Sequence, residues 1–331
     1  LKLGTLALMG GELEAAQTAA GAILEHHADD RDGRVLDAAI MLRRGDVERA
    51  DQVAKSVLEE DPLHENAISV AVGVLNARGR TDEAVSFIDE SLARLTDNIP
   101  LRQLKLVLLE QMNEPDAVIG VYEELFQLDP ENEEYRVALA SFYNRQQDFE
   151  AAESVLRDAI ADRVGDSGNI EQSYIAFVYN QRGLDAAEAE ANRLLQEQPD
   201  NQALRFLMAD YYAQNSRFDD AERVLGEVIE TAEGDVVLDG KASLARLKLF
   251  TEDVDSATAL TEEVIDESAE HRGANFVRGL VHLQADEWDE AIRSGRTALR
   301  RGPNWTPGLK LVAEAHLKKG ENDLALNALN E

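Results

Sequence analysis

A small residue recurs along this chain at a nearly constant interval of roughly 34 residues, and a fixed period of about 20 to 50 residues indicates a solenoid. In a solenoid each unit buries its apolar face only against its neighbours. The spacing therefore predicts about ten copies of one unit. The recurring alanines, whose separations vary little along the chain, are Ala16, Ala50, Ala84, Ala117, Ala152, Ala187, Ala221, Ala257, Ala291 and Ala325.

Two breaks fall in each period and divide it into two helices. Proline lacks an N–H group and disfavours helical backbone in the residue before it, so it ends a helix. Prolines at a related spacing, which predict breaks between repeats, are Pro62, Pro130, Pro199 and Pro303. Glycines that predict a second break, shortly before the recurring alanine, are Gly11, Gly45, Gly79, Gly183 and Gly320.

Within the predicted helices the apolar residues follow the helical period. In residues 135–160, for example, Leu139, Ala140 and Tyr143 form one stripe, and Ala152 and Leu156 belong to a second. Two antiparallel helices approach closely only where one side chain is small. Small residues that satisfy this need in the first helix are Gly4, Ala38, Ala140, Ala209, Ala245, Gly279 and Ala313.

This pattern resembles the tetratricopeptide repeat. One matching run contains Gly279, His282, Trp288, Ala291 and Pro303. The resemblance implies an all-α, right-handed superhelical solenoid of antiparallel helix pairs. It implies a single domain over residues 1–331 with about ten repeats, the first and last of them incomplete. Departures from the pattern predict a shift of one residue in the unit at 98–129 and an irregular junction at 163–169.

The charge balance restricts the partners that the chain can bind. Its 33 Lys and Arg residues face 65 Asp and Glu residues, a formal net charge of −32, which disfavours a phosphate backbone. We therefore expect no nucleic-acid partner.

The longest apolar stretch, residues 67–75, is far shorter than the roughly 20 residues of a spanning helix, so we expect no transmembrane segment here. Because the sequence begins at Leu1 inside a predicted helix, we expect it to be a fragment.

The sequence offers no group of residues arranged for catalysis. It has no cysteine, and its six histidines include no pair at metal-binding spacing on one helix. Phosphate-binding glycine loops and nucleophile motifs are also absent from the sequence. His282 and His316 occupy the position of aromatic residues in sister repeats, which predicts half-buried packing rings. We expect a non-enzyme with no cofactor and no metal site.

The resemblance implies a concave groove lined by the first helix of each repeat, which commonly holds a peptide. Amides suit a peptide backbone, and aromatic rings supply contact area. The alternative is that Tyr179 and Phe206 only pack against adjacent helices. The residues projected onto the groove are Ser141, Asn144, Arg145, Gln172, Tyr179, Asn180, Phe206, Asp210, Gln214, Arg246 and Phe250.

A second candidate surface, the basic end, lies near the end of the sequence. Between positions 291 and 319 the only acidic residue is Glu314. Such a surface could bind anionic partners, lipid headgroups, polysaccharide or a neighbouring acidic repeat. The alternative is that arginines favour helix C-termini through the helix dipole. The basic end comprises Arg293, Arg296, Arg300, Arg301, Lys310, Lys318 and Lys319.

These features predict a scaffold that binds a protein or peptide partner. A weaker resemblance to bacterial envelope proteins favours an envelope assembly, secretion or exopolysaccharide system, and a periplasmic or membrane-anchored location over the cytoplasm. The alternative is a regulatory or substrate-docking module of a larger enzyme, such as a glycosyl- or sulfotransferase. Apolar residues that could support end-to-end self-association are Leu3, Leu6 and Ala7 in the first helix, and Leu324, Leu326 and Leu329 in the last.

The first prediction concerns the solution spectrum. We expect circular dichroism to show a nearly all-helical protein whose melting temperature does not change when a chelator is added. The reason is that every predicted element is an amphipathic helix and no ligand cluster is present in the sequence. A substantial strand signal would contradict the fold, and a chelator-dependent melting temperature would contradict the absence of a structural metal.

Overall fold

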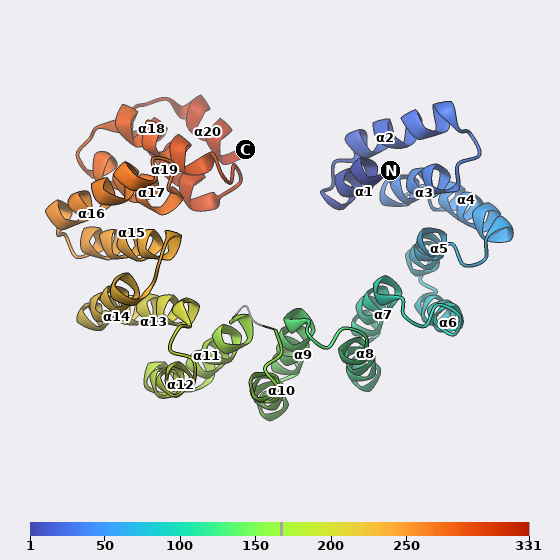
Figure 1. Ribbon diagram of the computed structural model, residues 1–331. Helices are drawn as coiled ribbons and strands as arrows, with labels where there is room; N and C mark the ends of the chain where they lie inside the picture. Colours follow the sequence, from blue (N-terminus) through green and yellow to red (C-terminus); the bar gives the residue numbers. More distant parts are fainter. Residues whose placement is uncertain (166–167, 331) are drawn as a thin grey trace. The chain divides into compact units, whose positions relative to one another are not determined.

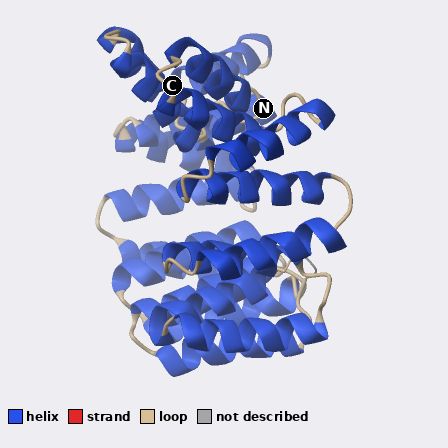
Figure 2. Ribbon diagram, turned by 90° about the vertical axis from the view of Figure 1, so that its left-hand side faces the viewer, coloured by secondary structure: helices blue, strands red, loops and turns tan. Residues whose placement is uncertain are grey.

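The computed structural model describes residues 1–165 and 168–330, and every regular element in these ranges is an α-helix (Figure 2). The expected irregular junction at 163–169 therefore lies partly outside the described residues. The chain divides into two compact units, residues 1–147 and 148–331. Each unit is described by itself.

In the first unit, each helix packs against the next one along the chain, from α1 to α9, and consecutive helices run antiparallel (Figure 1). The first helix of each repeat also contacts the first helix of the next from α1 to α7. The helices are α1 (Lys2–Met9), α2 (Leu13–His26), α3 (Arg31–Arg43), α4 (Val47–Glu60), α5 (Glu65–Ala77), α6 (Thr81–Leu92), α7 (Ile99–Met112), α8 (Pro115–Leu128) and α9 (Glu133–Arg145).

The second unit repeats this arrangement, and first helices contact each other from α11 to α19. Its helices are α10 (Phe149–Ala161), α11 (Asn169–Arg182), α12 (Leu184–Glu197), α13 (Gln202–Gln214), α14 (Phe218–Thr231), α15 (Asp235–Phe250), α16 (Val254–Glu267), α17 (Arg272–Gln284), α18 (Trp288–Leu299), α19 (Thr306–Lys318) and α20 (Asn322–Asn330). The all-α repeat solenoid predicted from the sequence is confirmed.

The recurring small residue lies on the second helix of each repeat. Nine of the ten predicted alanines are buried, but Ala117 is exposed and Val118 beside it is fully buried. The alanine is therefore the wrong marker in this repeat. Counting from Val118 makes the steps back to Ala84 and on to Ala152 equal. In this repeat the larger Val118 takes the buried position that alanine takes in the others, so a search for alanine alone places this position one residue too early.

Close helix packing explains the small residues of the first helices. A Cβ atom added at Gly4 would lie 2.6 Å from Cδ2 of Leu36, and one added at Gly279 would lie 2.6 Å from Cδ2 of Leu311. Real Cβ atoms do not approach other heavy atoms so closely, so a larger residue at either position would require the leucine side chain of the following first helix to move.

The breaks between helices occur as predicted and have clear physical causes. Pro62 lies between α4 and α5, and Asp61 before it has extended backbone (φ −142°, ψ 91°). Inside a repeat, Gly45 ends α3 with a left-handed φ of 84°. Its N–H donates to the carbonyl of Leu42, and the next N–H donates to that of Met41, as in a Schellman turn. The same left-handed position holds Ser216 after α13.

Ion pairs join consecutive repeats at a regular position, and we name them the junction pairs. In each, a carboxylate on the second helix of one repeat contacts a basic group at the end of the following first helix or in the turn after it. Their N–O distances lie between 2.7 and 2.9 Å. The junction pairs are Glu14–Arg44, Glu48–Arg78, Glu153–Arg182, Glu188–Arg217, Glu222–Lys248 and Asp289–Lys319.

Large apolar side chains are exposed on the first and last helices. Leu3 on α1 is 81% exposed, and Leu326 on α20 is 61% exposed. Leu6, Leu324 and Leu329 are exposed as well, whereas Ala7 is half-buried. Self-association through these faces stays a prediction.

A prediction on pH follows from carboxylates held by basic partners. Burial alone would raise the pKa of Asp51, but hydrogen bonds from Lys55 and Arg78 bring the pKa below its usual 3.8. A carboxylate with a lowered pKa stabilises the fold above its unfolded value, and this contribution is lost as the pH falls through the folded value. We expect Asp51→Asn to lower the melting temperature at pH 7, and the difference from wild type to shrink below about pH 4.

Each variant is compared with wild type at the same pH, because acid also relieves repulsion between the carboxylates of a chain with a net charge of −32. Glu262→Gln, at an exposed position on α16, is the control and should follow wild type over the whole range. A constant difference between Asp51→Asn and wild type from pH 7 to pH 3 would contradict the prediction.

Candidate functional site

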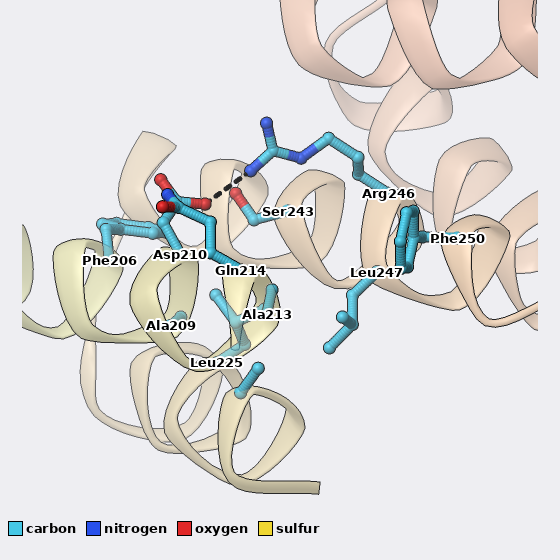
Figure 3. A pocket seen from close by; sticks show the side chains of 11 residues that line it. Phe206, Ala209, Asp210, Ala213, Gln214, Leu225, Ser243, Arg246, Leu247 and Phe250 are labelled. Atoms are coloured by element: carbon cyan, nitrogen blue, oxygen red, sulfur yellow. Dashed lines mark hydrogen bonds and ion pairs between the residues drawn. The ribbon is translucent and has the colours of Figure 1, made fainter. Parts of the chain in front are cut away.

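A cavity of about 400 Å³ opens between α13, α14 and α15 of the second unit (Figure 3). Residues from all three helices line it, so its shape depends on how two consecutive repeats pack. The lining residues are Phe206, Ala209, Asp210, Ala213, Gln214, Ala221, Leu225, Ser243, Arg246, Leu247 and Phe250.

Small side chains create the space, and large apolar ones bound it. Ala209 and Ala213 lie one turn apart on α13, so this helix leaves room where it faces α15. Phe206 and Phe250 flank the cavity from opposite sides, with Leu247 between them (Figure 3). Phe250 is 70% exposed, which is unusual for so large an apolar side chain.

One ion pair crosses the cavity between two first helices. Nη2 of Arg246 on α15 lies 2.7 Å from Oδ1 of Asp210 on α13, and both side chains are more than half exposed. Figure 3 shows the hydroxyl of Ser243 on the same side as this pair. An exposed pair contributes only about 0–1 kcal/mol. Both groups can therefore exchange their mutual contact for contacts with a ligand at small cost.

An aromatic stack joins the preceding first helix, α11, to α13. The rings of Tyr179 and Tyr211 lie 4.0 Å apart at 8°. The amide Nδ2 of Asn215 donates to the Tyr179 hydroxyl at 2.8 Å and to the carbonyl of Tyr211. Burial raises the pKa of the Tyr211 hydroxyl. Tyr179 thus packs against the adjacent helix, as the alternative interpretation of the sequence holds.

Behind this stack, Tyr212 is held in its protonated form. Burial, together with a hydrogen bond and charge from Glu188, raises its pKa to about 12. The Arg217 guanidinium lies 4.7 Å from the centre of the Tyr212 ring and also pairs with Glu188. This cluster joins α12, α13 and α14 and is structural.

The structure brings together some of the predicted groove residues. Phe206, Asp210, Gln214 and Arg246 line the cavity together with Phe250. Gln172, Tyr179 and Asn180, all on α11, lie outside its lining.

The remaining predicted groove residues belong to the first unit. Ser141, Asn144 and Arg145 are on α9, where all three are exposed. Nη2 of Arg145 lies 2.9 Å from the carboxylate of Glu110 on α7. This pair joins two consecutive first helices, much as Asp210 and Arg246 do in the second unit.

Sequence reasoning missed part of the lining. Ala213, Leu225, Ser243 and Leu247 line the cavity but are not among the residues that the sequence projects onto the groove. The available signal was the coincidence of alanines at 209, 213 and 221 with a phenylalanine at 250. These residues predict a cavity only when it is known that α13 and α15 face each other.

Several members of the basic end are already paired with carboxylates. Arg293 pairs with Glu290, and Nη1 of Arg300 lies 2.7 Å from Glu270. Lys319 forms a junction pair with Asp289. Arg296 and Arg300 line two adjacent hollows beside α18, of about 370 and 660 Å³.

Three of the six histidines take structural positions. Nδ1 of His64 accepts from the backbone N–H of Ala67 and caps α5, and His271 caps α17 in the same way. Nδ1 of His316, whose ring is buried rather than half-buried, lies 2.7 Å from Glu321. Within 1–165 and 168–330, no cluster of three or more His, Cys, Asp or Glu side chains is arranged to hold a metal ion. None of the helices described has the length and apolar character to cross a membrane.

A prediction distinguishes packing from ligand contact at Tyr179. We expect Tyr179→Phe, which removes the hydrogen bond from Asn215, to cost about 1 kcal/mol of unfolding free energy. Tyr179→Ala also removes the stack and should cost about 2–3 kcal/mol. Denaturant unfolding of both variants measures this. Full stability of Tyr179→Ala would show that the ring serves the surface and does not hold α11 against α13.

Comparison with known proteins assigns the repeats to a family. Models of the tetratricopeptide repeat match residues 109–169, 176–235 and 243–304, together more than half of the chain. A curated relative, tetratricopeptide repeat protein 21B of Xenopus laevis, is 28% identical over 93 residues. That match covers 28% of this chain and only 7% of the relative.

Solved structures of similar architecture include a tetratricopeptide repeat protein from Parabacteroides merdae. It is 17% identical, with a TM-score of 0.38, and the match covers 86% of this chain and 98% of that one. The Cut9–Hcn1 heterotetramer of the APC/C matches with 11% identity and a TM-score of 0.46, over 99% of this chain and 85% of that one. The repeat period, the paired helices and the family models lead to one conclusion: the chain belongs to the tetratricopeptide-repeat superfamily.

Proposed function

We propose that this chain is a non-enzymatic scaffold that binds an extended segment of a partner protein. The cavity between α13 and α15 takes an apolar side chain of that segment. Tetratricopeptide repeats support a general role in protein–protein interaction, and an architecture made only of such repeats is typically non-catalytic. The observation that carries the proposal is an aromatic-walled hollow with a loosely held ion pair across it.

The apolar part of the cavity supplies affinity. Phe206, Leu247 and Phe250 surround a space that a leucine- or phenylalanine-sized side chain can enter. Burying such a side chain contributes about 1.5–3 kcal/mol, and covering the exposed Phe250 adds to it. The walls come from two helices, so the site exists before a ligand arrives and loses little entropy on binding.

The polar part of the cavity supplies orientation. Asp210 can accept a backbone N–H of the ligand, and Arg246 can donate to a backbone carbonyl. Gln214 lines the same cavity and offers a donor and an acceptor. These groups recognise the main chain and fix its direction, while the aromatic walls select an apolar side chain.

The test fills the cavity. Ala213→Leu places three additional carbon atoms in the lining, and Ala259→Leu places the same atoms at an exposed position of α16. A peptide selected from a random library on the wild-type protein serves as the probe. We expect Ala213→Leu to weaken its binding about tenfold or more in calorimetry, and Ala259→Leu to bind as wild type does.

Helical content and melting temperature of both variants must match wild type for the comparison to count. Phe250→Ser provides an independent measurement, because it removes a wall of the cavity at an exposed position. If the probe binds both altered proteins with wild-type affinity, the binding site lies elsewhere on the chain.

A further inference from the structure

Two hollows beside α18 share no lining residue with the cavity between α13 and α15. We infer that this face is a docking site for a short acidic segment of a partner protein that also carries an apolar side chain. The inference does not rest on the proposed function, because the two sites share no residue.

The local charge is opposite to that of the chain as a whole. Residues 291–330 contain seven Lys or Arg residues and three Asp or Glu residues, whereas the whole chain carries 33 against 65. Asp289 and Glu290 also line the hollow of about 660 Å³, where they pair with Lys319 and Arg293 and leave Arg296 and Arg300 facing it. A basic face on such an acidic protein attracts an acidic segment locally, while the remainder of the surface repels it. The attraction therefore directs an acidic ligand to this end of the second unit.

The arginines are not required by the repeat. Arg296 and Arg300 of the α18 region correspond, one repeat earlier, to Glu262 and Asp266 of α16, which are exposed. The same helical face is therefore acidic in one repeat and basic in the next. A packing role does not explain this reversal, because the acidic version of the face also folds into a repeat.

The guanidinium groups are available to a ligand. Among the described residues, no carboxylate lies within ion-pair distance of Arg296, and its side chain is exposed. Arg300 pairs with Glu270 at 2.7 Å, but both side chains are largely exposed (61% and 44%). Exposed pairs of this kind contribute about 0–1 kcal/mol, so a ligand carboxylate can replace Glu270.

An apolar lining distinguishes this site from a plain cationic patch. Arg296 and several apolar residues line the hollow of about 370 Å³ between α18, α19 and α20. Leu309 and Val312 form its buried floor (8% and 3% exposed), and Leu324 presents an exposed apolar side chain (46%). A peptide that alternates acidic and apolar side chains can contact both the arginines and the apolar lining. A phosphate backbone satisfies only the arginines, and its length would carry it onto acidic surface.

The experiment measures fluorescence anisotropy of a labelled peptide of alternating glutamate and leucine at low salt. Its comparison probes are a peptide of alternating glutamate and serine and a short DNA duplex. The test protein carries Arg296→Glu with Arg300→Gln. The control carries Arg193→Glu with Arg157→Gln on α12 and α10, which makes the same change in net charge beside another surface hollow.

We expect the test protein to bind the glutamate–leucine peptide about tenfold more weakly than wild type, and the control to be unchanged. Leu324→Asn should weaken binding of the glutamate–leucine peptide and leave binding of the glutamate–serine peptide unchanged. Equal losses in test and control, or no loss in the test protein, overturn the site. If the wild-type protein binds the DNA duplex or the glutamate–serine peptide as tightly as the glutamate–leucine peptide, the assignment of the site to an acidic and apolar segment is overturned.

Discussion

Every repeat of this chain depends on a short distance between helices that no single repeat can enforce. The first and second helices meet at small buried residues, and the apolar faces that remain are covered only by the next repeat. Gly4 and Gly279 show how little room there is, since a single added Cβ atom would collide with a leucine of the following first helix. The apolar contacts between repeats and the volume of the cavity depend on this separation, whereas the turns depend on residues such as Pro62 and Gly45.

The cavity is a local exception to that packing. At the position eight residues before the recurring alanine, α11 carries Tyr179 and α17 carries Leu283, whereas α13 carries Ala213. The exposed Phe250 of α15 lines the space beside it. A repeat array tolerates such a gap because the neighbouring repeats remain packed. A binding cavity can therefore form between two repeats while the packing of the other repeats stays unchanged.

The sequence predicted the fold well because the fold repeats its signals. Pro62 and Gly45 mark breaks by their own backbone chemistry, and ten in-phase copies average out exceptions such as Val118. Left-handed turns without glycine, such as the one at Ser216, carry no signal of that kind, so their positions followed only from the period.

The site was less predictable, because it depends on pairs of residues that lie on separate helices, far apart in the sequence. Asp210, Gln214 and Arg246 were identified from their helix face, but nothing in the sequence indicated that two of them pair. Tyr179 looked equally suited to a groove and to a packing interface. The structure shows its stack on Tyr211, and its use in a groove stays a prediction. The volume between α13 and α15 is a property of two facing helices, which a linear sequence does not display.

The junction pairs are the part of the contact between consecutive repeats that responds to the surrounding electrolyte. Each pair crosses from one repeat to the next near the surface, where its attraction falls as the screening length shortens from about 10 Å at 0.1 M salt to about 3 Å at 1 M. The apolar contacts beneath do not weaken in the same way. Within a unit, high salt would thus weaken pairs such as Glu222–Lys248 between α14 and α15 and leave the apolar contacts as the main link between repeats.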